Sequence, residues 1–216
     1  MPLKNPELTK YTTASQVIAT YNFNDIAEGT GSTNFYLSIS KDSVGTDYFL
    51  TANTGTKSSS IRSDASPTSP FLEWGDAENK TFTFDLSQFN FPKNIEGQAF
   101  FSVNYYISNT GNNATDFQPT FTLYHYDGTT ETSLGAVTTE AQNPTVIEPH
   151  WGTFLCSINI TNKYFATGDI LRLKINYSAG NPTDIGTRRI YCDPANRTPT
   201  YGNADSFVSV PFRIEQ

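Results

Sequence analysis

Apolar and polar residues alternate with a period of two along much of this chain, and this alternation constrains the fold more than any other feature. In the segment 80–87 the alternate apolar residues are Phe82, Phe84 and Leu86. The segment 98–108 repeats the pattern over a longer stretch. A period of two places the apolar set on one side of an extended strand and the polar set on the other. Both segments are therefore predicted to be half-buried strands.

The same alternation predicts strands over 119–126, 132–137, 150–160, 168–178 and 206–216, with weaker patterns over 16–24, 32–40, 47–53 and 186–193. Asp127 and Gly128 supply a tight turn between the first two of these segments, because both residue types tolerate turn conformations. Only 161–166 favours a short helical turn. Pro211 interrupts the last pattern, and we expect that strand to lie at a sheet edge.

About eleven short strands separated by turn signals, with no alternating helices, predict an all-β fold. We expect an antiparallel two-sheet sandwich of the jelly-roll type. With 216 residues and no internal repeat, the chain is interpreted as one domain over 16–216, preceded by a polar N-terminal arm over 1–15.

The charge balance excludes several function classes. The net charge is −7 and the sequence pI is about 4.7, so the chain's own field repels nucleic-acid phosphates and anionic membranes. No apolar run approaches the roughly 18 residues of a membrane span, and the first residues do not resemble a signal peptide. We expect a protein made in a cytoplasm, with neither nucleic acid nor membrane as a partner.

Residues that could do chemistry are few. Cys156 and Cys192 have no paired spacing for zinc, and buried inert thiols are favoured over a disulfide between them. His125 shares a strand face with apolar residues, which favours a hydrogen-bonded structural histidine over a catalytic or metal-binding one. His150 stands at a strand start. The clusters 109–116 and 201–206 carry oxygen ligands without calcium-loop spacing, so no cofactor is predicted.

An apolar group lies within a segment that otherwise suggests a long surface loop, from 58 to 80. Phe71, Leu72 and Trp74 either fold back to close an end of the sandwich or dock on another subunit. Together with Pro211 they are the candidate interface. Trp151 and the tyrosine-rich strands also admit stacking on a surface glycan, although exposed tyrosines are ordinary cross-strand residues.

Three motifs in the last third of the chain carry a family resemblance. They are T-G-D-I-L-R-L from Thr167, I-Y-C-D-P-A-N-R-T from Ile190 and V-P-F-R-I from Val210. This order resembles jelly-roll virion structural proteins of tailed bacteriophages, the capsid decoration or head-accessory proteins. The resemblance covers about a quarter of the chain and implies a virion location, with the major capsid protein or other virion proteins as partners.

Within these motifs, Asp193, Asn196 and Arg197 are expected to form a structural clasp in which the arginine reaches back to the aspartate or to a neighbouring carbonyl. Arg172 is expected to point outward and to pair with an acid on an adjacent strand. The fold-defining role is favoured, with contacts between subunits as the second interpretation.

These observations lead to the prediction of a non-enzymatic phage virion protein that decorates or stabilises the outer capsid surface as a homo-oligomer, with a trimer as one option. The alternative is a carbohydrate- or receptor-binding module of a fibre or tail tip. A glycoside hydrolase or lyase would need paired acids in a cleft, and a major capsid subunit would need a basic arm.

Overall fold

The computed structural model describes residues 30–41, 46–52, 71–75, 79–109, 117–142, 149–177, 186–192 and 206–213. Within these ranges the chain forms eleven β strands and no helix. In chain order the strands are β1 (Thr30–Lys41), β2 (Thr46–Thr51), β3 (Phe71–Trp74), β4 (Lys80–Asp85), β5 (Lys93–Asn109), β6 (Thr120–Tyr126), β7 (Glu131–Thr138), β8 (His150–Phe165), β9 (Ile170–Tyr177), β10 (Gly186–Tyr191) and β11 (Phe207–Arg213).

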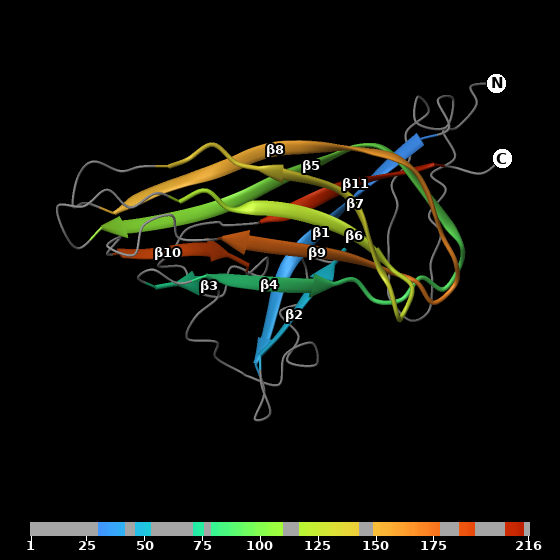
Figure 1. Ribbon diagram of the computed structural model, residues 1–216, viewed down its shortest axis with the longest axis horizontal. Coiled ribbons are helices and arrows are strands. Elements are labelled where there is room, and N and C mark those ends of the chain that lie inside the picture. Colours follow the sequence, from blue (N-terminus) through green and yellow to red (C-terminus); the bar gives the residue numbers. More distant parts are fainter. Residues whose placement is uncertain are drawn as a thin grey trace, which may run out of the picture.

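The hydrogen-bonded path runs β3-β10-β5-β11-β1-β2-β4-β9-β6-β7, and β8 pairs with β5 (Figure 1). At β2 the strand order passes from one layer to the other. This strand pairs with β1 and contacts β4 through one parallel bridge, Phe49–Asp85. The first layer therefore contains β8, β5, β10, β3, β11 and β1, and the second contains β4, β9, β6 and β7. The two layers enclose one core.

Aromatic contacts show that the two layers face each other. The rings of Phe101 on β5 and Phe121 on β6 stack with centroids 5.4 Å apart. Trp74 on β3 meets Phe82 on β4 edge to face at 4.8 Å. Each fully buried side chain of this size contributes about 1.5–3 kcal/mol through loss of water contact. The alternation in the sequence thus supplies one core face from each layer.

The prediction of an all-β, two-sheet sandwich is confirmed, and the jelly-roll type stays a prediction. Two local expectations were wrong. Residues 161–166 form no helical turn, because β8 keeps pairing with β5 as far as Phe165, opposite Lys93. The expected loop 58–80 contains strand β3, which pairs with β10. The arm 1–15 and the weak pattern 16–24 lie outside the described residues.

Pro211 does not mark a sheet edge, so that expectation was also wrong. Strand β11 lies between β1 and β5. The register with β5 shifts between Ser209 and Phe212, and this bulge holds Pro211 out of the β5 ladder, where its missing N–H would otherwise cost a bond. Gly97, at a φ of +118°, faces it: a Cβ there would stand 3.5 Å from the proline ring. The bulge in β11 and the positive φ of Gly97 in β5 together allow a proline in a central strand.

A glycine on β8 provides a test of this packing. Gly152 lies opposite Tyr105, whose ring crosses the space above it, and a Cβ at Gly152 would lie 2.4 Å from the tyrosine oxygen. That ring is held by stacking on Phe154 at 4.3 Å and by donating to Gln142 Oε1 at 2.9 Å. We expect Gly152→Ala to lower the free energy of unfolding by about 1–3 kcal/mol, measured by urea denaturation.

The control is Thr161→Ala, an exposed position on the same strand. Equal stability of the two variants would show that Tyr105 moves aside without cost.

Candidate functional site

The outer face of the first layer carries a row of four residues across four strands, and all but Ser102 are apolar or aromatic. Cross-strand register places Leu155 of β8 opposite Ser102 of β5, Ser102 opposite Phe207 of β11, and Phe207 opposite Tyr36 of β1. We call these four residues the apolar row. Leu155 is 78% exposed, which is high for a leucine on a sheet. Phe100, on the same side of β5, is 51% exposed and extends the apolar surface.

A second row crosses the same face nearer the start of β8. Trp151 stands opposite Tyr106 of β5, Tyr106 opposite Arg189 of β10, and Arg189 opposite Glu73 of β3. The indole of Trp151 lies over the ring of Tyr191, at a centroid distance of 5.4 Å and an interplanar angle of 23°. Tyr106 meets it edge-on at 4.7 Å. We call Trp151, Tyr106 and Tyr191 the aromatic platform.

Charged and polar groups border this platform. The Arg189 guanidinium lies 4.2 Å from the centroid of the Phe71 ring and 5.4 Å from that of Tyr106. Its Nε donates to Glu73 Oε2 at 2.6 Å, which fixes the cation and neutralises it. Between the two rows, Thr153 Oγ1 donates to Asn104 Oδ1 at 2.6 Å. The face thus combines exposed rings with neutral hydrogen-bonding groups.

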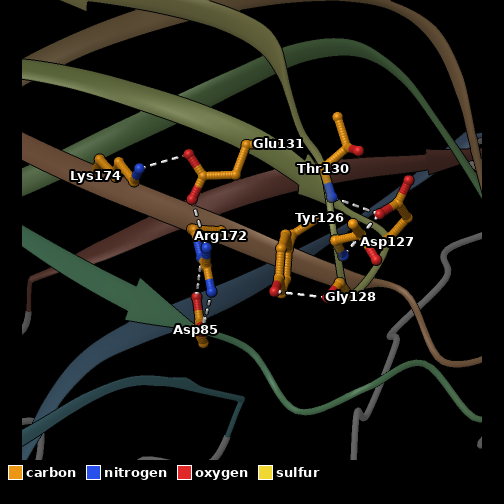
Figure 2. Close-up of polar contacts among 9 residues, drawn as sticks. Asp85, Tyr126, Asp127, Gly128, Thr130, Glu131, Arg172 and Lys174 are labelled. Atoms are coloured by element: carbon orange, nitrogen blue, oxygen red, sulfur yellow. Dashed lines mark hydrogen bonds and ion pairs between the residues drawn. The ribbon is translucent and has the colours of Figure 1, made fainter.

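The outer face of the second layer has a different character, shown in Figure 2. Arg172 of β9 binds both carboxylate oxygens of Asp85 on β4, at 2.6 and 2.7 Å, and also contacts Glu131 on β7. Lys174 donates to the other oxygen of Glu131 at 2.5 Å. The guanidinium also lies 4.1 Å from the Tyr126 ring centroid. Two cations and two anions neutralise one another here, so this ionic cluster is structural.

The expected pairing of Arg172 with an acid on an adjacent strand is present in this cluster. The bonds from Asp85, and then from Glu131, hold the pKa of Arg172 above its ordinary value. The other members of the predicted clasp, Asp193, Asn196 and Arg197, lie outside the described residues, as do nearly all residues of the two oxygen-rich clusters.

The candidate interface residues occupy different environments. Leu72 and Trp74 are buried between the layers, and the Trp74 indole donates to the carbonyl of Lys80 at 3.1 Å. Pro211 is also buried. Leu72 and Trp74 belong to the core, and the interface role of the four residues stays a prediction. Phe71 alone of the four is partly exposed, at the border of the aromatic platform.

His125 is the hydrogen-bonded structural histidine that its strand position indicated. Its Nε2 lies 2.6 Å from Asp169 Oδ2, and its ring packs edge-on against Phe165. Asp169 Oδ2 also accepts the N–H of Ala166 at 2.7 Å, which fastens the turn between β8 and β9. The pair therefore ties the end of β6 to that turn.

Both cysteines are free thiols, one half-buried and the other buried. Burial raises the pKa of Cys156 to about 11, so its thiol stays protonated at neutral pH and is a poor nucleophile. No group of three or more His, Cys, Asp or Glu side chains that could hold a metal ion occurs among the described residues. The part of the chain that the structure describes also has no helix long and apolar enough to cross a membrane.

Sequence reasoning missed the apolar row, although the sequence contained its signal. Leu155 and Phe100 stand at positions of the alternation that face outward and would ordinarily be polar. Exposed apolar side chains at such positions are unusual on a sheet. Only the cross-strand register aligns Leu155, through Ser102, with Phe207 and Tyr36, which are far away in the sequence.

No protein-family model and no curated protein matches this sequence. Solved structures do share its fold. An α-amino acid ester hydrolase matches with a TM-score of 0.57 at 14% identity, over 84% of this chain and 36% of that one. The hydrolase SACOL2612 of the CocE/NonD family, from Staphylococcus aureus, matches with a TM-score of 0.50 at 11% identity, over 85% of this chain and 37% of that one. The chain thus spans little more than a third of the length of these enzymes.

These matches contradict the functional prediction made from the sequence. The fold occurs as part of hydrolases, so the predictions of a non-enzymatic capsid decoration protein and of its alternative at a fibre or tail tip were wrong. The motifs misled because G-D turns and alternating closing strands are local signals that unrelated β-sandwiches share. The resemblance itself, the partners and the virion location stay predictions.

The ionic cluster predicts a pH dependence of stability. The bonds from Lys174, and then from Arg172, hold the pKa of Glu131 below its ordinary 4.5. Because the pKa of Glu131 is lowered in the folded state, the ionised side chain stabilises the fold above about pH 4.5. This stabilisation is lost as the pH falls through the pKa that Glu131 has in the folded protein. We expect Glu131→Gln to lower the free energy of unfolding by about 1 kcal/mol at neutral pH, measured by urea denaturation, and by progressively less as the pH falls below 4.5.

Glu140→Gln, at an exposed carboxylate two residues beyond the end of β7, serves as the control and should lack this pH dependence. A deficit of Glu131→Gln that is constant with pH would contradict the electrostatic explanation.

Proposed function

We propose that this β-sandwich is a domain of a hydrolase that packs against the catalytic unit through its apolar row. The observation that carries the proposal is the apolar surface formed by Leu155 and Phe100 on the two longest strands of a fold that solved hydrolases share. Apolar patches of this kind on a soluble domain mark contact surfaces. An enzyme's own catalytic unit is the partner that the fold likeness indicates.

The share of each chain that aligns supports placing the catalytic groups outside the sandwich. The α-amino acid ester hydrolase aligns with 84% of this chain but only 36% of its own length. Most of that enzyme therefore lies outside the shared sandwich. By analogy, the reacting groups of the proposed hydrolase belong to a unit beyond the sandwich, and the sandwich positions or completes it.

The chemistry within the described residues agrees with this assignment. His125 and Asp169 form an acid–histidine pair, but they are mostly buried, and Asp169 is also committed to the β8–β9 turn. The half-buried thiol of Cys156 has a raised pKa, the opposite of what activates a nucleophile. The proposal therefore assigns the nucleophile to the catalytic unit.

The outer faces of the two layers differ in the free energy of covering them, and this difference indicates which face contacts the catalytic unit. Covering the ionic cluster would remove Arg172, Asp85 and Glu131 from the water that still reaches them, and that desolvation opposes association. Covering the apolar row gains about 25 cal/mol for each Å² removed from water. Association is thus favoured on the first layer.

The decisive experiment compares two variants that add the same charge to β8. The tagged protein, purified from its source cells at native expression, is assayed for hydrolysis of α-amino acid esters, the substrate class that the first matched enzyme's name gives. We expect hydrolysis in the wild-type preparation and an at least tenfold loss in Leu155→Arg, a difference of about 1.4 kcal/mol, because the arginine cannot pack in an apolar contact.

Asn159→Arg, at an exposed polar position of the same strand, is the matched control and should keep the activity. Thermal unfolding of both variants checks that the sandwich remains folded. Absence of ester hydrolysis in the wild-type preparation, equal activity of the two variants, or full activity of the isolated 216-residue chain would each refute the proposal.

A further inference from the structure

The turn between β6 and β7 contains the only Asp-Gly pair of the sequence, Asp127–Gly128, and the sequence has no Asn-Gly pair. A glycine has no Cβ to shield its backbone nitrogen, so the side-chain carbon of a preceding aspartate approaches that nitrogen more easily than it approaches the nitrogen of other residues. Gly128 lies at a φ of +91°, and a Cβ placed there would meet no atom within 4 Å. Steric cover therefore does not protect this pair.

A covalent rearrangement is available to such a pair. The backbone nitrogen of Gly128 attacks the side-chain carboxyl carbon of Asp127. A C–N bond forms, and the carboxyl group loses its hydroxyl together with the amide proton as water. Water then opens the resulting succinimide at either carbonyl, which yields aspartate or isoaspartate. The rearrangement needs no co-reactant besides water, and isoaspartate carries an additional methylene group in the backbone.

The fold holds the Asp127 carboxylate in an unreactive state (Figure 2). Its Oδ1 accepts the backbone N–H of Thr130 at 2.7 Å and that of Thr129 at 2.9 Å. These two bonds, the one from Thr130 first, hold the pKa of Asp127 below its ordinary value. An ionised carboxylate is a poor electrophile, because it has no hydroxyl to lose as water. Attack therefore requires the carboxyl group to give up both bonds and to take up a proton.

The backbone on either side of the reacting bond is held as well. The Tyr126 hydroxyl donates to the carbonyl of Gly128 at 2.8 Å, and the N–H of Asp127 donates to the carbonyl of Thr130 at 3.3 Å. Glu131, the residue opposite Tyr126, belongs to the ionic cluster, which fastens the hairpin just beyond the turn. The Gly128 nitrogen thus cannot turn toward the carboxyl carbon while the hairpin is closed.

We propose that Asp127–Gly128 is the chain's site of spontaneous aspartate isomerisation, and that the closed turn holds this reaction back until the β6–β7 hairpin opens. The additional methylene group of isoaspartate lengthens the turn, so that Tyr126 and Glu131 no longer meet in register. Modification during an opening therefore prevents the hairpin from closing with its native pairs. This inference does not depend on the proposed role in a hydrolase.

The test compares the rate of isoaspartate formation in the folded and in the unfolded chain. The purified protein is incubated in mildly acidic buffer with and without guanidinium chloride. Isoaspartate is then measured in each proteolytic peptide by labelling with a protein isoaspartate methyltransferase. We expect the peptide that contains Asp127 to react fastest of all peptides in the unfolded chain. In the folded chain we expect the same peptide to react roughly tenfold more slowly.

Two matched variants test the turn itself. Tyr126→Phe removes the donor to Gly128 and keeps the ring beside Arg172, so we expect isomerisation in the folded chain to rise about threefold. Tyr124→Phe is the control, because Tyr124 lies on the same strand and also beside a cation, Lys174. It should react at the wild-type rate. Thermal unfolding confirms that both variants are folded, and in guanidinium chloride both should match the wild type.

Three results would overturn the proposal. The first is an equal rate in the folded and the unfolded chain. The second is another aspartate peptide that reacts faster than the Asp127 peptide in the unfolded chain. The third is a folded Tyr126→Phe variant that reacts no faster than Tyr124→Phe.

Discussion

Strand β5 is the element on which the rest of the structure depends. Its 17 residues pair with β8 along one edge, and with β11 and then β10 along the other. Both rows of the outer face exist because of this double pairing. Ser102 aligns Leu155 with Phe207, and Tyr106 aligns Trp151 with Arg189. A one-residue slip of β5 would reverse which of its side chains face the core and would destroy core and surface together. The register of one strand thus determines stability and any function of that face.

The outer faces of the two layers carry different kinds of side chain. The second layer uses charges that satisfy one another, with Arg172 shared between carboxylates of two other strands. Such a cluster keeps a sheet face soluble while holding its strands in register. The first layer leaves Leu155, Phe100 and Trp151 in water, at a cost that folding alone does not require. The two outer faces therefore differ in kind: one is held by paired charges and the other exposes apolar side chains.

The fold class could be predicted from the sequence because each strand carries its own periodicity. Phe82 and Phe84 alternate with polar residues whether or not the partner strand is known, and both are buried. Pairing could not be predicted, because register is a property of two segments. The position of β11 between β1 and β5 is compatible with Pro211 because of a bulge opposite Gly97, which no single-strand pattern contains. The role of Trp74 depended on strand β3, a four-residue segment too short to show a period.

The candidate site was harder to predict than the fold, and the reason is geometric. Trp151 was noticed as a residue that could stack on a sugar, but its platform needs Tyr191 from a strand that pairs with β5 and not with β8. An aromatic residue alone on a strand is an ordinary cross-strand partner. Trp151 is instead part of a group of packed rings, because Tyr191 lies nearly parallel to it. That arrangement arises because β8 and β10 pair on opposite sides of β5, which brings Trp151 and Tyr191 together across the intervening strand. The long central strand therefore creates the site in the same way that it creates the fold.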